Sequence, residues 1–204
     1  MEMKRTILYL AGIFLIIITA KLNSQTIKIE TTQISYEDQL RPCMTNDLDP
    51  TPKEVKKAWS KFLDKNYDID VSGIGWFSDE DILIAKDVTI GDISEKRINL
   101  YSRILEKGNG SEIKVFASFG YDFFIGEDNY PKEFKSLNEL FYKFLFSYLS
   151  EYYSDMLEET SDKIDDNNKE KVSLLKSIEK NKDKIEDAKE DIAELNSEKP
   201  ETNE

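Results

Sequence analysis

Carboxylates are the only side chains in this sequence whose number and spacing suggest chemistry. Acidic pairs occur three times, at Asp79 and Asp81, at Glu127 and Asp128, and at Asp165 and Asp166. Two carboxylates about 5–9 Å apart can hydrolyse a glycosidic bond. However, 41 of the 204 residues are acidic, so pairs of this kind arise by chance, and we do not predict a glycosidase from them.

Other kinds of catalytic or metal site are excluded by composition. The chain has no histidine and a single cysteine, Cys43. It therefore lacks the residues for a histidine-based triad, a histidine metal ligand or a thiolate zinc site. The segment Gly108-Asn109-Gly110 lacks the lysine of a phosphate-binding loop. We predict that the protein is not an enzyme and has no cofactor or metal site.

The best candidate binding residues are aromatic. Tyr121, Phe123 and Phe124 lie between Gly120 and Gly126, and Trp76 and Phe77 lie in another glycine-flanked stretch. Aromatic side chains on loops commonly contact ligands or partners. The alternative is that these rings close one end of the core beneath the second predicted helix.

The N-terminus has the pattern of a signal peptide. Lys4 and Arg5 precede an apolar run over 7–20, as expected for a basic start and an apolar core of about 7–15 residues. Cleavage between Ser24 and Gln25 would remove residues 1–24, and a cut after Ala20 is the alternative. We therefore predict a periplasmic or secreted protein that meets the membrane only through this segment. The alternative is an anchor formed by the uncleaved signal.

The charge argues against nucleic acid as a partner. Without residues 1–24 the chain has 25 basic and 40 acidic side chains, a net charge of −15. Nucleic-acid binding requires a concentrated basic surface. Export also bears on Cys43, because a lone thiol in an oxidising compartment is either buried or paired with a partner. We predict that Cys43 is buried.

Residues 25–149 are predicted to form an α+β domain. Apolar residues alternate in 26–30 and, most clearly, in 113–119, and short turn-prone segments separate the later runs. Connections this short favour an antiparallel β-meander sheet, with helices on one side. The segment 31–50, which contains Pro42 and Pro50, is interpreted as a long connection.

Two helices are predicted to cover this sheet. Thr51-Pro52-Lys53-Glu54 forms a capping box at the start of the first helix, whose apolar stripe includes Trp59. Ser136-Leu137-Asn138-Glu139 marks the start of the second, although Pro131 could begin an earlier turn. Apolar residues surround the second helix from Leu137 to Tyr153, so it needs a further surface: the first helix, another subunit or its own tail.

Residues 150–196 are predicted to form an acidic helical or coiled-coil extension, and 197–204 a disordered tail. A heptad frame places apolar residues at most a positions and several polar residues at d. The a positions are Leu157, Ile164, Lys171, Ile178, Ile185 and Ile192; the d positions are Thr160, Asn167, Leu174, Asn181, Ala188 and Leu195. A solvated single helix is the alternative, as is a hairpin broken at 165–168.

The order of these elements, with the segment Lys57-Ala58-Trp59-Ser60-Lys61-Phe62 in the first helix, resembles uncharacterised exported α+β proteins of Gram-negative bacteria with a C-terminal helical tail. The resemblance implies a location in the envelope and supplies no activity or site residues. The sequence thus favours an exported interaction or scaffold module, which binds an unidentified protein or self-associates through its C-terminal helix. The alternative is a carrier that holds an apolar small molecule between sheet and helices.

Overall fold

The computed structural model describes residues 27–73 and 82–197, and these residues form two compact units that divide between Tyr148 and Leu149. The predicted signal peptide with Ser24 and Gln25, and all but the first residue of the predicted disordered tail, lie outside the described residues. So do Trp76 and Phe77. The predicted tail residue Ser197 is the last residue of a helix.

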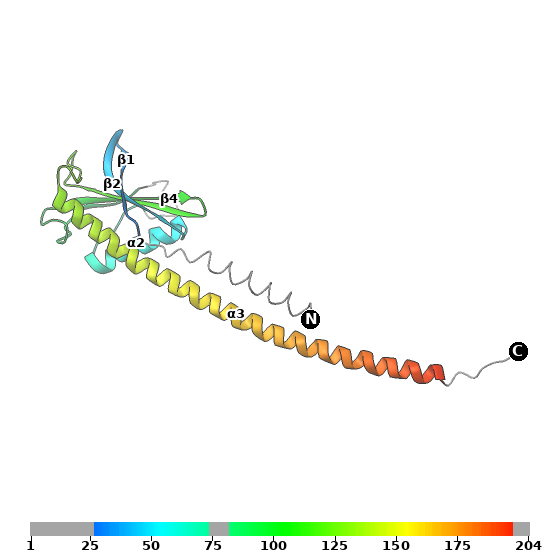
Figure 1. Ribbon diagram of the computed structural model, residues 1–204. Helices are drawn as coiled ribbons and strands as arrows, with labels where there is room; N and C mark the ends of the chain where they lie inside the picture. Colours follow the sequence, from blue (N-terminus) through cyan, green and yellow to red (C-terminus); the bar gives the residue numbers. More distant parts are fainter. Residues whose placement is uncertain (1–26, 74–81, 198–204) are drawn as a thin grey trace. The chain divides into compact units, whose positions relative to one another are not determined.

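The first unit contains a five-stranded antiparallel sheet in the order β1-β2-β5-β4-β3 (Figure 1). The strands are β1 (Glu30–Tyr36), β2 (Gln39–Leu48), β3 (Ile82–Val88), β4 (Ile98–Lys107) and β5 (Gly110–Ser118). Strands β3, β4 and β5 form a meander, and β2 adds the β1–β2 hairpin to the free edge of β5. The predicted α+β class, with an antiparallel sheet and a long C-terminal helix, is confirmed.

Two predictions about the N-terminal part of the sheet were wrong. Residues 27–29 precede the first strand, and the predicted connection contains both β1 and β2. Pro42 lies within β2, where it is opposite Gln33 of β1. Pairing of β2 with β5 begins only at Met44, so β2 has one neighbouring strand at Pro42 and tolerates a residue without an N–H group there.

Helix α2 (Pro52–Tyr67) begins with the predicted capping box. The backbone N–H of Glu54 donates to Oγ1 of Thr51, and the backbone N–H of Thr51 donates to Oε2 of Glu54 at 2.8 Å. Pro52 occupies the first turn, where its missing N–H costs nothing. The Thr51 hydroxyl also donates to Oε2 of Glu54 at 2.7 Å, and this bond, together with the one from the Thr51 backbone N–H, lowers the pKa of Glu54. The local sequence therefore fixes where α2 starts.

Helix α2 lies on one side of the sheet, together with the first turns of α3 (Pro131–Ser197) (Figure 1). Trp59 is fully buried and packs against Phe144 of α3 with ring centroids 4.8 Å apart. Trp59 is therefore a core residue, as predicted. The first helix also supplies the additional surface that the apolar residues of α3 require, because Phe141 and Phe144 both pack on Trp59.

Helix α3 begins before Ser136, at the earlier start that Pro131 allowed, and ends at Ser197, the residue after the predicted extension. It starts at Pro131, so Ser136 lies within the helix rather than capping it. Residues 165–168 are also helical, and the hairpin alternative is wrong. Side-chain pairs of helical spacing lie just before this segment and at its end: Lys163 contacts Glu159, and Lys169 contacts Asp166. Extending an existing helix is easier than nucleating a new one, so a short run of Asp and Asn does not end it.

Candidate functional sites: an aromatic loop and a helical seam

A cluster of aromatic rings covers one face of the sheet, the face on the other side from Val115. Side chains alternate along β5, so Phe116 lies on this face, where its ring stacks on Tyr101 at 4.8 Å. Tyr36 from the β1–β2 hairpin and Phe124 from the segment after β5 pack against the same two rings. Phe124 is therefore part of a core cluster that brings together β1, β4, β5 and the following loop.

A buried arginine joins this cluster to the loop that follows β5. The Arg41 guanidinium lies 4.2 Å from the centroid of the Phe124 ring, and its Nη2 donates to Oδ1 of Asp122 at 2.7 Å. A cation over an aromatic face is stabilised by the ring quadrupole. Arg41 therefore fixes two of the loop residues, Asp122 and Phe124, from one position in β2.

The loop over 119–125, between β5 and Gly126, presents two aromatic side chains to solvent, and we call it the aromatic loop. The backbone N–H of Phe119 donates to the carbonyl of Phe123, and the N–H of Phe123 donates to the carbonyl of Gly120, which closes a tight turn. Tyr121 at its tip has a φ of 48° and is 95% exposed, and Phe123 is 59% exposed. A large exposed ring in the left-handed region is uncommon and is found most often where function requires it.

Gly126 closes this loop, and its lack of a side chain is required. A Cβ atom there would lie 2.9 Å from Cγ of Pro42. Its N–H donates to Oδ1 of Asn129, whose amide donates to the carbonyl of Phe124. Contacts at Gly126 and at Arg41 thus hold the loop in place, and this fixes the positions from which Tyr121 and Phe123 extend into solvent.

The three described residues of the predicted aromatic site differ in exposure. Tyr121 and Phe123 are exposed, as contact residues must be, whereas Phe124 is buried and fits the interpretation that the rings close the core. The core that Phe124 closes lies on the sheet face opposite the helices, not beneath the second helix as proposed. Arg41 was missed, because its proximity to Phe124 depends on a strand that the sequence did not reveal.

Cys43 lies in the same aromatic cluster and is fully buried, as predicted. Burial raises the pKa of its thiol to about 11. Burial also raises the pKa of Tyr36 to about 12, with a further contribution from the neighbouring Tyr101. Both groups are therefore uncharged at neutral pH, and the thiol is protected from reaction because the thiolate is the nucleophile.

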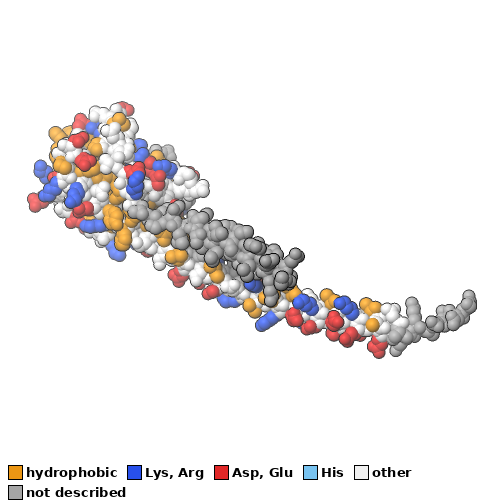
Figure 2. Space-filling model, in the orientation of Figure 1, with side chains coloured by type: hydrophobic (Ala, Val, Ile, Leu, Met, Phe, Trp, Pro, Cys, Tyr) orange, Lys and Arg blue, Asp and Glu red, His pale blue; other side chains and the backbone are white. Residues whose placement is uncertain are grey.

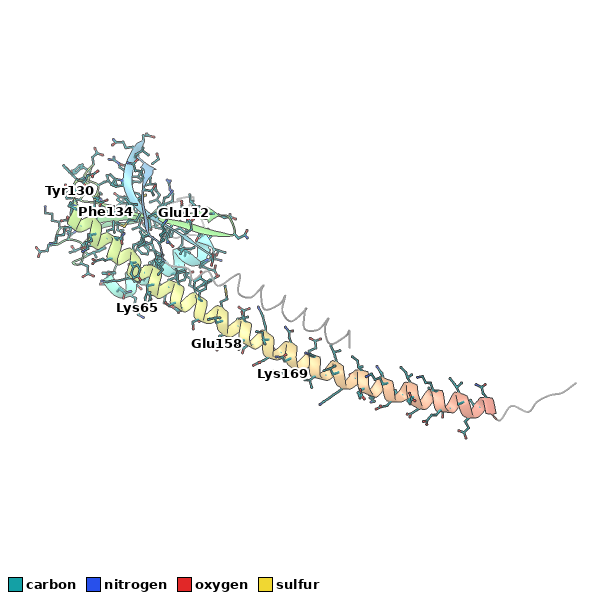
Figure 3. All side chains as sticks on the ribbon, in the orientation of Figure 1. Lys65, Glu112, Tyr130, Phe134, Glu158 and Lys169 are labelled. Atoms are coloured by element: carbon teal, nitrogen blue, oxygen red, sulfur yellow. The ribbon has the colours of Figure 1, made fainter. Side chains whose placement is uncertain are left out.

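The second candidate lies in the second unit and is the a/d face of α3 between Leu157 and Leu195, which we call the tail seam. Five aliphatic a positions are each at least 50% exposed: Leu157, Ile164, Ile178, Ile185 and Ile192. Figure 2 shows hydrophobic side chains recurring along the helix between charged ones. Figure 3 shows tail side chains, including Glu158 and Lys169, projecting from the helix.

The described residues contain no group of three or more acidic or cysteine side chains placed to hold a metal ion. The pair Glu127 and Asp128 is exposed, as is the pair Asp165 and Asp166, while Asp79 and Asp81 lie outside the described residues. None of the helices in the described ranges is both long and apolar enough to cross a membrane. No protein-family model matches this chain, and no curated protein or solved structure is significantly similar to it.

Proposed function

We propose that this protein is an exported interaction module of the cell envelope that assembles through the tail seam. The tail seam is the single observation that carries the proposal. A helix that functions alone in water gains nothing from aliphatic residues at five of six positions spaced seven apart, whereas a helix that packs on another helix requires such a stripe. Exposed apolar surface of this extent is typical of an interface.

The aromatic loop supports a contact role for the first unit. Tyr121 and Phe123 extend from a loop that is held by Arg41 and Gly126, and fixed aromatic side chains lose little entropy on binding. Tyrosine and phenylalanine are also enriched at the centres of protein interfaces. The loop is therefore a second place where a partner could bind, separate from the tail seam.

Export is supported by the N-terminal sequence. The basic start, the apolar run over 7–20 and the Ser24–Gln25 junction fit a signal peptide. Intact mass of the protein recovered from the envelope should correspond to a chain that begins at Gln25. A mass that retains Met1, in the membrane fraction, would favour the anchored alternative instead.

Two substitutions with similar chemistry test the role of the tail seam. Ile178 is 50% exposed at an a position, and Val172 is 53% exposed at a b position, outside the seam. Ile178→Asp and Val172→Asp add the same charge at similar exposure. We expect only Ile178→Asp to reduce assembly, measured by sedimentation velocity at low and high salt and by cross-linking in envelope extracts.

A version that ends at Tyr153 removes the seam and provides the second arm of the test. Assembly that disappears on truncation and in Ile178→Asp, but persists in Val172→Asp, supports the proposal. Equal behaviour of all these proteins, with no assembly in any of them, would show that the tail is a solvated appendage. An apolar molecule that copurifies with the protein would favour the carrier alternative.

A further inference from the structure

We infer that the tail seam binds a second copy of itself, with the two helices antiparallel and Leu157 opposite Leu195 of the second copy. The inference rests on the proposed function and extends it by naming the partner. It concerns residues 157–195, all of which are exposed in the described helix. The tail carries an excess of acidic side chains, so the arrangement of its charges decides which pairing is possible.

Apolar side chains match in this alignment. In an antiparallel pair, each a position packs against a d position of the other helix. When Leu157 faces Leu195, Ile178 faces Leu174 near the middle of the overlap. Twofold symmetry repeats each contact, so apolar layers form at both ends and at the centre. Ile164 opposite Ala188 adds a smaller apolar layer between them.

The polar residues in the seam disfavour a parallel pair. In a parallel pair in register each residue meets its own twin, so Lys171 would face Lys171 in the interface. The antiparallel alignment places Lys171 opposite Asn181, whose side-chain carbonyl can accept a hydrogen bond from the ammonium group. Two layers stay mixed, since Ile185 faces Asn167 and Ile192 faces Thr160, so the affinity should be modest.

The charges beside the seam favour the same antiparallel alignment. In two antiparallel helices, the g positions of the two copies lie side by side along the edge of the seam. In this alignment Lys163 of one copy lies beside Asp191 of the other, and Glu170 lies beside Lys184. Each pair occurs twice by symmetry. A parallel pair would instead place Lys184 beside Lys189, and like charges at these positions oppose association.

Neighbouring antiparallel registers bring like charges together. A shift of one heptad in one direction places Glu170 beside Asp191. The same shift in the other direction places Lys163 beside Lys184. Opposite charges meet at both flanking positions only when Leu157 faces Leu195, so the charges select one register.

The charges that this pairing requires are largely free in the single chain. In the part of α3 that the structure describes, Glu170, Lys184 and Asp191 make no ion pair, whereas Lys163 contacts Glu159 at 2.5 Å. Other tail lysines already pair within the helix, as Lys182 does with Glu179. A second copy would therefore find three of its four flanking charges available.

Disulfide formation tests the orientation directly. In the full chain with Cys43→Ala, Leu157→Cys and Leu195→Cys are made as two separate proteins, one labelled with a heavy nitrogen isotope. We expect neither protein alone to form a disulfide dimer under mild oxidation, and their mixture to form a mixed dimer. In the antiparallel pair the two Leu157 positions are separated by roughly 57 Å of helix. Dimers of each single protein would show a parallel pair and overturn the inference.

Charge reversal tests orientation and register independently. Lys184→Glu places Glu beside Glu170 in the antiparallel pair and should raise the dimer Kd about five-fold, in the range expected for two exposed pairs. In a parallel pair the same change removes the contact of Lys184 with Lys189 and should lower the Kd. The matched control is Lys176→Glu, at an outward f position. Adding Glu170→Lys to Lys184→Glu should restore the original Kd.

The failures of the two proposals can be distinguished. If the full chain is a monomer and the mixed disulfide does not form, the antiparallel pair is excluded. If Ile178→Asp still blocks cross-linking to a different envelope protein and Val172→Asp does not, the proposed function stands with another partner. If the mixed disulfide forms and Lys184→Glu weakens the dimer, both are supported.

Discussion

Arg41 is almost completely buried, while its partner Asp122 lies at the surface. Their side chains are 8% and 76% exposed, and Nη2 of Arg41 lies 2.7 Å from Oδ1 of Asp122. Nε of Arg41 is buried and has no hydrogen-bond partner among the described residues. Removing a partner from a buried charge costs more than removing the charge itself. The stability of the aromatic loop therefore depends strongly on an exposed residue.

Asp122→Ala should lower the free energy of unfolding by about 1–3 kcal/mol, because the Arg41 guanidinium loses its carboxylate acceptor while it stays buried. Arg41→Met should cost less, since it removes the buried charge and retains an apolar stem over Phe124. Asp128→Ala, at an exposed position in the same segment, is the control and should change little. Urea unfolding of the three variants measures the differences. Equal values for Asp122→Ala and Asp128→Ala would show that the ion pair contributes nothing.

Trp59→Ala should cost about 3–5 kcal/mol, the range for removing a large aromatic side chain from a core. The indole is fully buried between α2 and α3, and its Nε1 has no hydrogen-bond partner among the described residues. Trp59→Phe should therefore be milder, because it keeps a ring against Phe144 and breaks no hydrogen bond. Thermal and urea unfolding provide the measurement. A loss below about 1 kcal/mol for Trp59→Ala would contradict its place in the core.

Stability should fall at alkaline pH as Cys43 and Tyr36 ionise. Burial raises the pKa of Cys43 from 9.0 to about 11 and that of Tyr36 from 10.0 to about 12. The folded state thus retains these protons longer than the unfolded state does, and the resulting stabilisation is complete below pH 9. It is lost as the pH rises through both folded pKa values. Urea unfolding from pH 8 to 12 should show this decline, and Cys43→Ala should flatten its lower part.

Tyr121→Ala should leave stability within about 0.5 kcal/mol of the parent protein, as expected for an exposed side chain. Tyr121→Gly should be tolerated equally well, because glycine adopts the positive φ of this position without strain. If Tyr121 is a contact residue, both variants should lose cross-linking to a partner while they remain folded. Cross-linking of both variants at the level of the parent protein would remove Tyr121 from the binding surface.

Local signals made α2 and β5 predictable from sequence. The start of α2 depends on hydrogen bonds between residues three positions apart, Thr51 and Glu54, which a sequence motif encodes completely. The run from Ile113 to Phe119 alternates except at Phe116, and β5 (Gly110–Ser118) covers nearly all of it. In both cases the determining contacts lie within a few residues along the chain.

The aromatic cluster could not be predicted, because it depends on strand register. Phe116 meets Tyr101 because they are directly paired across β4 and β5, and Tyr36 reaches them through a hairpin that begins before Pro42. Pro42 indicated a connection rather than a strand. It lies in β2, however, at a position where β1 is the only neighbouring strand of the described sheet. Similarly, the polar segment 165–168 suggested a break in the helix, but the helical residues on either side keep this segment helical within α3.

The continuity of α3 has a thermodynamic consequence for its exposed part. A helix in water must first form a costly nucleus, with a statistical weight of about 10⁻³. In α3 the buried residues Phe134, Leu137 and Phe141 hold the first turns in helical form, so later residues extend a turn that already exists. In the monomer the C-terminal end should therefore fray gradually on warming. Amide exchange of the monomer should become faster from Tyr153 towards Ser197, without one cooperative step.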